Sequence, residues 1–254
     1  MTTEHEQFKN ECEQNAKSMA KDPNLAKTTK EWINQANAFK YSYNFEWCDR
    51  PIIQYPQDIL ALQELVWRVK PDLIVETGVA HGGSVVLNSS LLALLDLAEK
   101  IPRNDSKRKV IAIDIDIRTH NKTALDAHPF NDYFELIESS STDTSVVEYV
   151  TSEAKNHDRV LVILDSNHTH EHVLQELNAY AGLVTKESYC IVFDTIIEDL
   201  PDNSFPDRPW DKGDNPKTAT LEFLQTHPEF EIDEAVEDKL MISVAPSGYL
   251  KRVG

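Results

Sequence analysis

The chain has 254 residues, 41% of them apolar, and a formal net charge of −18. This length suits one α/β domain with additions, and the apolar fraction is enough for a sizeable core. The negative charge argues against nucleic acid or an anionic membrane surface as partner, because both are bound by a basic face.

Three widely spaced cysteines form neither a zinc pattern nor a disulfide framework: Cys12, Cys48 and Cys190. This spacing favours a reducing, cytoplasmic setting. The first residues are polar and acidic, unlike a signal or transit peptide. No apolar run reaches the roughly 18 residues of a membrane span.

Residues 1–50 are polar and helix-prone, and we expect a helical arm there, followed by a single domain over residues 51–254. The arm ends in a group of aromatic residues: Phe39, Tyr41, Tyr43, Phe45 and Trp47. These rings either pack the arm onto the domain or form a lid or wall for a substrate. The first interpretation is favoured, because aromatic side chains are most often core.

Beyond the arm, short apolar runs alternate with segments of helical spacing. We expect helices at residues 59–69, 85–99, 170–180 and 217–226, with one more capped by Ser141 or Thr142. We expect strands at residues 73–75, 110–113, 133–137, 160–164 and 189–193, and two closing strands at 230–232 and 240–244. This alternation predicts an α/β fold with a doubly wound, mostly parallel, Rossmann-like sheet of seven strands.

Four acids each follow an expected strand: Glu76, Asp114, Asp165 and Asp194. Ligands of doubly wound sheets bind outside the carboxyl ends of the strands. We therefore expect the four carboxylates to converge on one edge of the sheet.

Residues 76–84 read Glu-Thr-Gly-Val-Ala-His-Gly-Gly-Ser and hold three of the chain's seven glycines. Glycines concentrated at a strand-to-helix turn predict a ligand that approaches the backbone closely. The segment lacks the dinucleotide pattern and the P-loop lysine, and Asp114 follows Gly78 by 36 positions instead of about 20.

These departures favour a cationic nucleoside without pyrophosphate, such as S-adenosylmethionine. Glu76 would lie near its aminoacyl end, and Asp114 would accept hydrogen bonds from its ribose hydroxyls. The alternative is an ordinary tight turn in which Glu76 complements the dipole of the next helix.

The second group of polar residues is Asp165, His168 and Asp194. Two acids from neighbouring strands can hold one hard divalent cation, which lowers the pKa of a bound hydroxyl. His168 would then act as general base. The alternative is a polar loop that caps a helix, and the histidine spacing disfavours a zinc or non-haem iron site.

Four segments resemble the cephalosporin hydroxylase-like family: residues 74–84, 113–118, 164–170 and 248–252. The resemblance covers roughly residues 40–254. It implies a class I methyltransferase fold related to the metal-dependent catechol O-methyltransferases. The implied activity is transfer of a methyl group from S-adenosylmethionine, with Mg²⁺, to a hydroxyl of a sugar or an antibiotic.

The resemblance also implies roles for individual residues. The cofactor-binding set is Glu76, Gly78, His81, Gly82, Ser84, Asp114, Ser140, Ser141 and Asp165. The metal ligands are Asp165, Asp194 and Thr195, and the catalytic residues are His168 and Asp165. The family often pairs two acids after the fifth strand, where this chain has Phe193-Asp194, so Glu198 and Asp199 are further candidates for a third ligand.

Residues 199–216 form a long loop rich in Asp and Pro, and loops of this length are often functional. This loop and residues 39–47 are the expected acceptor walls, with Trp210 either stacking on a sugar ring or anchoring the loop. The acceptor stays open among sugar, antibiotic and small phenol. The alternatives to a methyltransferase are a hydroxylase and a catalytically degenerate nucleoside-binding module, and the arm suggests a homo-oligomer.

Overall fold

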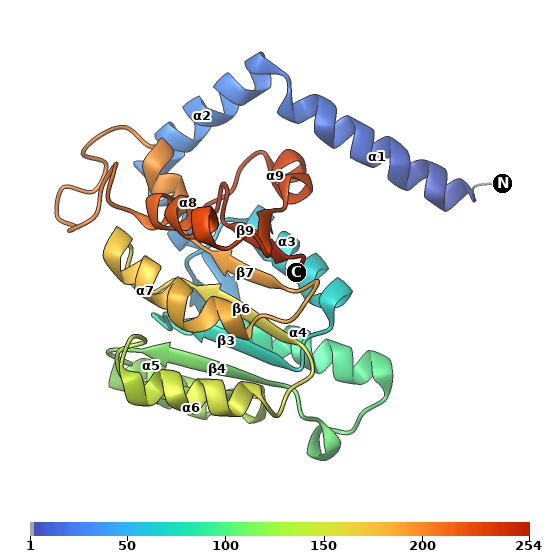
Figure 1. The fold of residues 1–254 in the computed structure, drawn as a ribbon, viewed down its shortest axis with the longest axis vertical. Helices are drawn as coiled ribbons and strands as arrows, with labels where there is room; N and C mark the ends of the chain where they lie inside the picture. Colours follow the sequence, from blue (N-terminus) through green and yellow to red (C-terminus); the bar gives the residue numbers. More distant parts are fainter. Residues whose placement is uncertain (1–2) are drawn as a thin grey trace.

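A computed structural model describes residues 3–254 and shows a central sheet of seven strands in the order β5-β4-β3-β6-β7-β9-β8 (Figure 1). The strands are β3 (Leu73–Thr77), β4 (Lys109–Asp114), β5 (Phe134–Glu138), β6 (Val160–Leu164), β7 (Tyr189–Val192), β8 (Phe230–Ile232) and β9 (Tyr249–Arg252). Strands β3 to β7 run parallel, and β9 lies antiparallel between β7 and β8. The predicted doubly wound, mostly parallel sheet is confirmed.

Helices cover both faces of this sheet (Figure 1). They are α3 (Pro56–Val69), α4 (Gly83–Glu99), α5 (Thr119–Asp126), α6 (Thr144–Ala154), α7 (His170–Tyr180), α8 (Pro216–Thr226) and α9 (Glu234–Leu240). Alternate residues of each central strand point to opposite faces. Ile74 therefore shares a core with α3 and α4, whereas Leu73 and Val75 share the other core with α6, α7 and α8.

The central strands consist of apolar runs because they are buried on both sides. All five residues of β3 and all five of β6 are buried, and the two strands pair in register from Leu73 opposite Val160 to Thr77 opposite Leu164. This register brings the residues that follow β3 and β6 side by side at one edge of the sheet.

Two of the sequence predictions for the sheet and its caps are wrong. Residues 240–244 form no strand, because α9 extends to Leu240 and the backbone N–H of Val244 donates to the buried carboxylate of Asp58 (2.9 Å). The last strand is β9 instead. Helix α6 is capped by Asp143, which accepts from Ser145 N at 2.8 Å, and not by Ser141 or Thr142.

The N-terminal arm is helical as expected, with α1 (Glu4–Ala20) and α2 (Pro23–Asn37) extending away from the sheet (Figure 1). No residue of α1 is buried. A hairpin of β1 (Phe45–Trp47) and β2 (Arg50–Ile52) follows and spans the expected boundary at residue 50. No helix within residues 3–254 is both long and apolar enough to cross a membrane.

Candidate functional site

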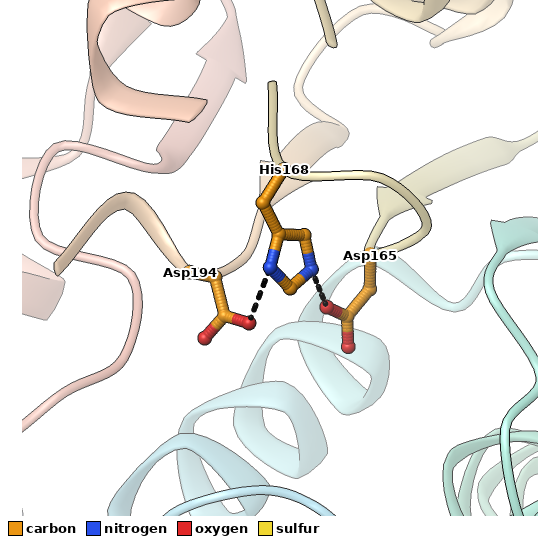
Figure 2. A group of neighbouring side chains, drawn as sticks. All are labelled: Asp165, His168 and Asp194. Atoms are coloured by element: carbon orange, nitrogen blue, oxygen red, sulfur yellow. Dashed lines mark ion pairs between the residues drawn. The ribbon is translucent and has the colours of Figure 1, made fainter. Parts of the chain in front are cut away.

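Asp165, His168 and Asp194 form a compact cluster at the carboxyl edge of the sheet (Figure 2). Asp165 directly follows β6, and Asp194 lies two residues after β7. The imidazole of His168 lies between the two carboxylates, with Nδ1 3.2 Å from Asp194 Oδ2 and Nε2 3.6 Å from Asp165 Oδ1. One ligand atom from each residue lies within 4.8 Å of the others.

Two residues of the cluster, Asp165 and His168, have pKa values above their ordinary ones. Burial, together with the nearby charge of Asp194, raises the pKa of Asp165 to about 7 despite the hydrogen bond with His168. Burial lowers the pKa of His168, but the facing carboxylates of Asp194 and Asp165 outweigh it and hold this pKa above its ordinary value. Asp165 and His168 therefore both bind a proton more tightly than the same side chains do in water.

The backbone at Asp194 is held in a conformation that most residues avoid. Its φ is +55°, in the left-handed region, which aspartate tolerates better than most side chains. The next residue, Thr195, is fully buried and its hydroxyl donates to the Pro246 carbonyl at 2.7 Å. Thr195 anchors this strained turn and does not line the cavity beside the cluster.

Gln54 is a site residue that the sequence did not indicate. It lies between β2 and α3, is only 4% exposed, and donates from Nε2 to Asp165 Oδ2 at 3.2 Å. Its Oε1 is buried without a hydrogen-bond partner. No motif surrounds Gln54, and it is 111 residues distant from Asp165 in the chain.

The backbone of Asp165 packs closely against Gly78 in the glycine turn, and this contact fixes the position of Asp165. Gly78 has a φ of +92°, and a Cβ there would lie 2.0 Å from the carbonyl oxygen of Asp165. At Gly82 the nearest neighbour is the Leu125 side chain, and at Gly83 it is the Pro51 carbonyl. The protein's own chain packs against these glycines, and Gly78 and Gly83 also line the cavity beside the cluster, so the predicted approach of a ligand to this turn stays a prediction.

Glu76 lies below the glycine turn and does not join the cluster. It is 1% exposed and accepts a hydrogen bond from Asn88 Nδ2 at 2.8 Å. Burial raises its pKa to about 7, against the hydrogen bonds from Ser84 and Asn88. A cavity of about 10 Å³ adjoins Glu76, Ser84 and Gln54, room for about one water molecule.

Asp114 also lies apart from the cluster. Its Oδ2 accepts from the backbone N–H groups of Val79 (2.7 Å) and Ala80 (3.1 Å), so it holds the glycine turn, and Oδ1 accepts from Asp116 N. The four predicted acids thus share one edge of the sheet, but only Asp165 and Asp194 meet.

Ser140 and Ser141 lie beyond β5, outside the cavity beside the cluster. The hydroxyl of Ser140 pairs with that of Thr142 at 3.0 Å. Ser141 is buried, and its Oγ lies 3.2 Å from His172 Nε2, so α7 helps to fix it.

A cavity of about 270 Å³ lies beside the cluster and the glycine turn. His81 and Ser84 line it from the turn, and its outer wall includes Tyr43, Phe205, Arg208 and Trp210. The ring of Trp210 lies 4.8 Å from that of His168, and the Arg208 guanidinium lies 5.2 Å from the Trp210 ring.

The aromatic residues of the arm divide between the two interpretations. Tyr41 packs edge-on against Trp32, Phe45 and Tyr55, and Trp47 donates to Ser90 Oγ at 3.0 Å. Tyr43 instead lines the cavity and is 54% exposed. Phe39 is 81% exposed and does neither.

Ordered contacts hold the loop of residues 199–216 at its base. Glu198 accepts from Gly213 N (2.8 Å) and Asn215 Nδ2 (2.6 Å), and Lys217 pairs with Asp199 at 2.7 Å. Glu198 and Asp199, the other candidates for a third ligand, thus position the wall that carries Trp210.

The donor set of the cluster fits a metal ion. Mg²⁺ prefers carboxylate and water oxygens, which suits Asp165 and Asp194. The imidazole of His168 would also admit a transition metal. Around the small cavity next to Asp165, the buried acceptors Glu76 and Gln54 Oε1 suit a cationic group of a ligand.

Comparisons with known proteins agree on one family. Residues 39–253 match the model described as Rhamnosyl O-methyltransferase/CmcI. The Rhamnosyl O-methyltransferase of Mycobacterium tuberculosis (strain ATCC 25618 / H37Rv) is 28% identical over 198 residues, 77% of this chain and 73% of the relative. That of Mycobacterium leprae (strain TN) is 25% identical over 208 residues, 81% of this chain and 82% of the relative.

Two solved structures share the fold. A CmcI structure with Mg and S-adenosylmethionine has a TM-score of 0.55 at 18% identity, covering 84% of this chain and 78% of that one. CalS11, a TDP-rhamnose 3'-O-methyltransferase, has a TM-score of 0.52 at 19% identity, covering 100% and 97%.

Proposed function

This chain belongs to the Rhamnosyl O-methyltransferase/CmcI family, and we propose that it transfers the methyl group of S-adenosylmethionine to a hydroxyl of a 6-deoxyhexose. Rhamnose, which names the curated relatives, is such a sugar. The cluster of Asp165, His168 and Asp194 beside a cavity of about 270 Å³ is the observation that carries the proposal.

Asp165 and Asp194 would hold Mg²⁺ or another divalent cation at the strand ends. The ion supplies Lewis-acid chemistry, by which a hydroxyl bound to it loses its proton more readily. Gln54 orients Asp165 through its amide N–H, and the Thr195–Pro246 hydrogen bond fixes the turn that presents Asp194. Outer-shell contacts of this kind tune metal affinity.

His168 is the proposed general base. Its ring lies between both carboxylates and lines the cavity, where it can meet an acceptor hydroxyl, and imidazole is the side chain best suited to take up a proton near neutral pH. As the methyl group moves, the carbon–sulfur bond of the sulfonium breaks and the carbon–oxygen bond forms. The hydroxyl proton passes to His168, and S-adenosylhomocysteine is released.

The glycine turn is the proposed cofactor site. Glu76 and Ser84 would receive the aminoacyl end, with Gly78, His81 and Gly82 forming the surface beside it. Asp114 would bind the ribose, since its Oδ1 accepts only one hydrogen bond in the structure. Ser140 and Ser141 would lie near the adenine.

Calorimetric titration tests the metal and cofactor sites separately. In Asp194→Asn we expect Mg²⁺ affinity to fall at least about tenfold, since one of two charged ligands is lost. The affinity for S-adenosylhomocysteine should change much less. Asp202→Asn, at an exposed loop position (83% exposed), is the matched control. Unchanged Mg²⁺ affinity in Asp194→Asn, or no binding of S-adenosylhomocysteine to the wild type, would overturn the proposal.

A reducing cytoplasmic setting and self-association through the arm complete the proposal. The first is supported by three cysteines without disulfides, two of them exposed. The second is supported by apolar side chains exposed on α1 and α2, among them Phe8, Leu25 and Trp32. Light scattering would give the mass in solution, and a monomer would contradict self-association.

A further inference from the structure

One inner wall of the cavity is apolar. It consists of Ile196, Ile197, Leu200 and Val244, whose exposed fractions are 7%, 3%, 5% and 5%. The first three lie two, three and six residues after the metal-ligand candidate Asp194 in the chain. The wall and the cluster therefore line the same cavity, and an acceptor whose hydroxyl meets the cluster would place its neighbouring groups near the wall.

The polar groups around this wall are already engaged. The N–H of Ile196 donates to the Val244 carbonyl (3.2 Å), and the N–H of Ile197 donates to the Asp194 carbonyl (3.2 Å). The nearby hydroxyl of Ser243 donates to Asp58 at 2.6 Å, deep in the protein. A hydroxyl of the acceptor that met this wall would lose its water and gain no partner among these groups.

Other residues around the cavity are polar or aromatic. Asp165, His168 and Asp194 offer the charged edge, and Trp210 presents its ring 4.8 Å from His168. An acceptor seated here needs one hydroxyl at the cluster, a face of C–H groups against Trp210, and an apolar group against the isoleucines. A hexose that lacks its C6 hydroxyl has all three.

We propose that the wall of Ile196, Ile197, Leu200 and Val244 is a subsite for the C6 methyl group of the acceptor. The inference rests on the proposed function and deepens it, because it says which residues reject a sugar with a C6 hydroxyl. An apolar pocket discriminates against an added hydroxyl by about 10- to 100-fold.

L-Rhamnose and L-mannose form the matched pair, since they differ only in the C6 hydroxyl. The probes are their methyl glycosides, offered with S-adenosylmethionine and Mg²⁺, and the readout is kcat/KM for each. Binding of both glycosides to protein loaded with S-adenosylhomocysteine is measured alongside. We expect the rhamnoside to be preferred by about 10- to 100-fold.

Ile197 is the position to change, because it lines the cavity but belongs to neither core cluster within the described residues. Ile197→Thr introduces a hydroxyl, and Ile197→Val removes the same volume without one. We expect the threonine variant to reduce the preference at least about fivefold and the valine variant to retain it. Melting temperatures show whether both variants stay folded.

The results distinguish failure of the C6 methyl subsite from failure of the proposed sugar methyltransferase activity. Equal use of both glycosides by the wild type, or equal effects of Thr and Val, overturns the subsite and leaves the sugar methyltransferase intact. If neither glycoside binds or is methylated while a phenol is methylated, the proposed acceptor class fails and the subsite falls with it.

Discussion

Replacing Gly78 by alanine would press directly on Asp165, one of the three residues of the cluster. The new Cβ would lie 2.0 Å from the Asp165 carbonyl oxygen, where real Cβ contacts stay beyond 3.0 Å. The Asp165 backbone would have to recede by the difference, about 1 Å. The left-handed φ of +92° adds strain for any residue with a Cβ.

The two costs can be added from their usual ranges. Overpacking costs about 1–3 kcal/mol, and left-handed strain about 1–2 kcal/mol, so Gly78→Ala should lower the free energy of unfolding by about 2–5 kcal/mol. At about 2–4 °C per kcal/mol for a chain of this size, the melting temperature should fall by roughly 5–20 °C. A displacement of about 1 Å at the reacting groups costs about 100-fold in turnover.

Alanine variants of two other glycines separate the effect of backbone strain from the effect of the steric clash. Gly213 has a φ of +85° but no atom within 4 Å of its added Cβ, so Gly213→Ala carries the strain alone. Gly182 has neither feature, and its alanine variant should be close to neutral. Calorimetric melting and Mg²⁺ titration would be run on all three. If Gly78→Ala melts and binds Mg²⁺ like Gly213→Ala, the contact between Gly78 and Asp165 plays no part in building the site.

Three further predictions concern proton and metal binding. Gln54→Ala should weaken Mg²⁺ binding by about 10- to 100-fold, because Asp165 loses the amide N–H that donates to it. If calorimetry shows an unchanged affinity, Gln54 does not position Asp165. Mg²⁺ affinity should rise by up to about tenfold per pH unit as the pH approaches 7 from below, and it should level off above 7. The reason is that Asp165, whose pKa is about 7, must release its proton before it binds the ion. An affinity that does not change from acid to neutral pH would contradict this. Glu76→Gln should raise the melting temperature at pH values above 7, where the buried carboxylate is charged at a cost, and this gain should shrink as pH falls from about 7 towards the ordinary pKa of 4.5 and vanish below it. The same variant should weaken binding of S-adenosylmethionine, and lower stability than the wild type at alkaline pH would refute the burial argument.

The sheet was predictable because its strands are continuous apolar runs bounded by acids. Residues 160–164 are all buried, and α7 begins and ends where the sequence placed it. Helix α5 was missed because only Asn121 and Leu125 are buried, which leaves little apolar periodicity. The closing strand was misplaced because Asp58, far away in the chain, binds the backbone of residue 244.

For the site, the strand-end rule placed Asp165 and Asp194 at one edge, and the structure brings them together with His168. The rule did not separate these from Glu76, whose side chain turns inward to Asn88, or from Asp114, whose side chain turns to the glycine turn. Gln54 follows no pattern, because its role depends on a contact made only by the folded chain.

We propose that Asp165, His168 and Asp194 support cation-dependent methyl transfer to a sugar hydroxyl. This proposal is tested most directly by mass spectrometry of methyl L-rhamnoside after incubation with the protein and S-adenosylmethionine, with Mg²⁺ or with a chelator. We expect a product heavier by one methylene, with one S-adenosylhomocysteine formed per product, in the presence of Mg²⁺ only. A product heavier by one oxygen, or equal methylation in the presence of the chelator, would contradict it.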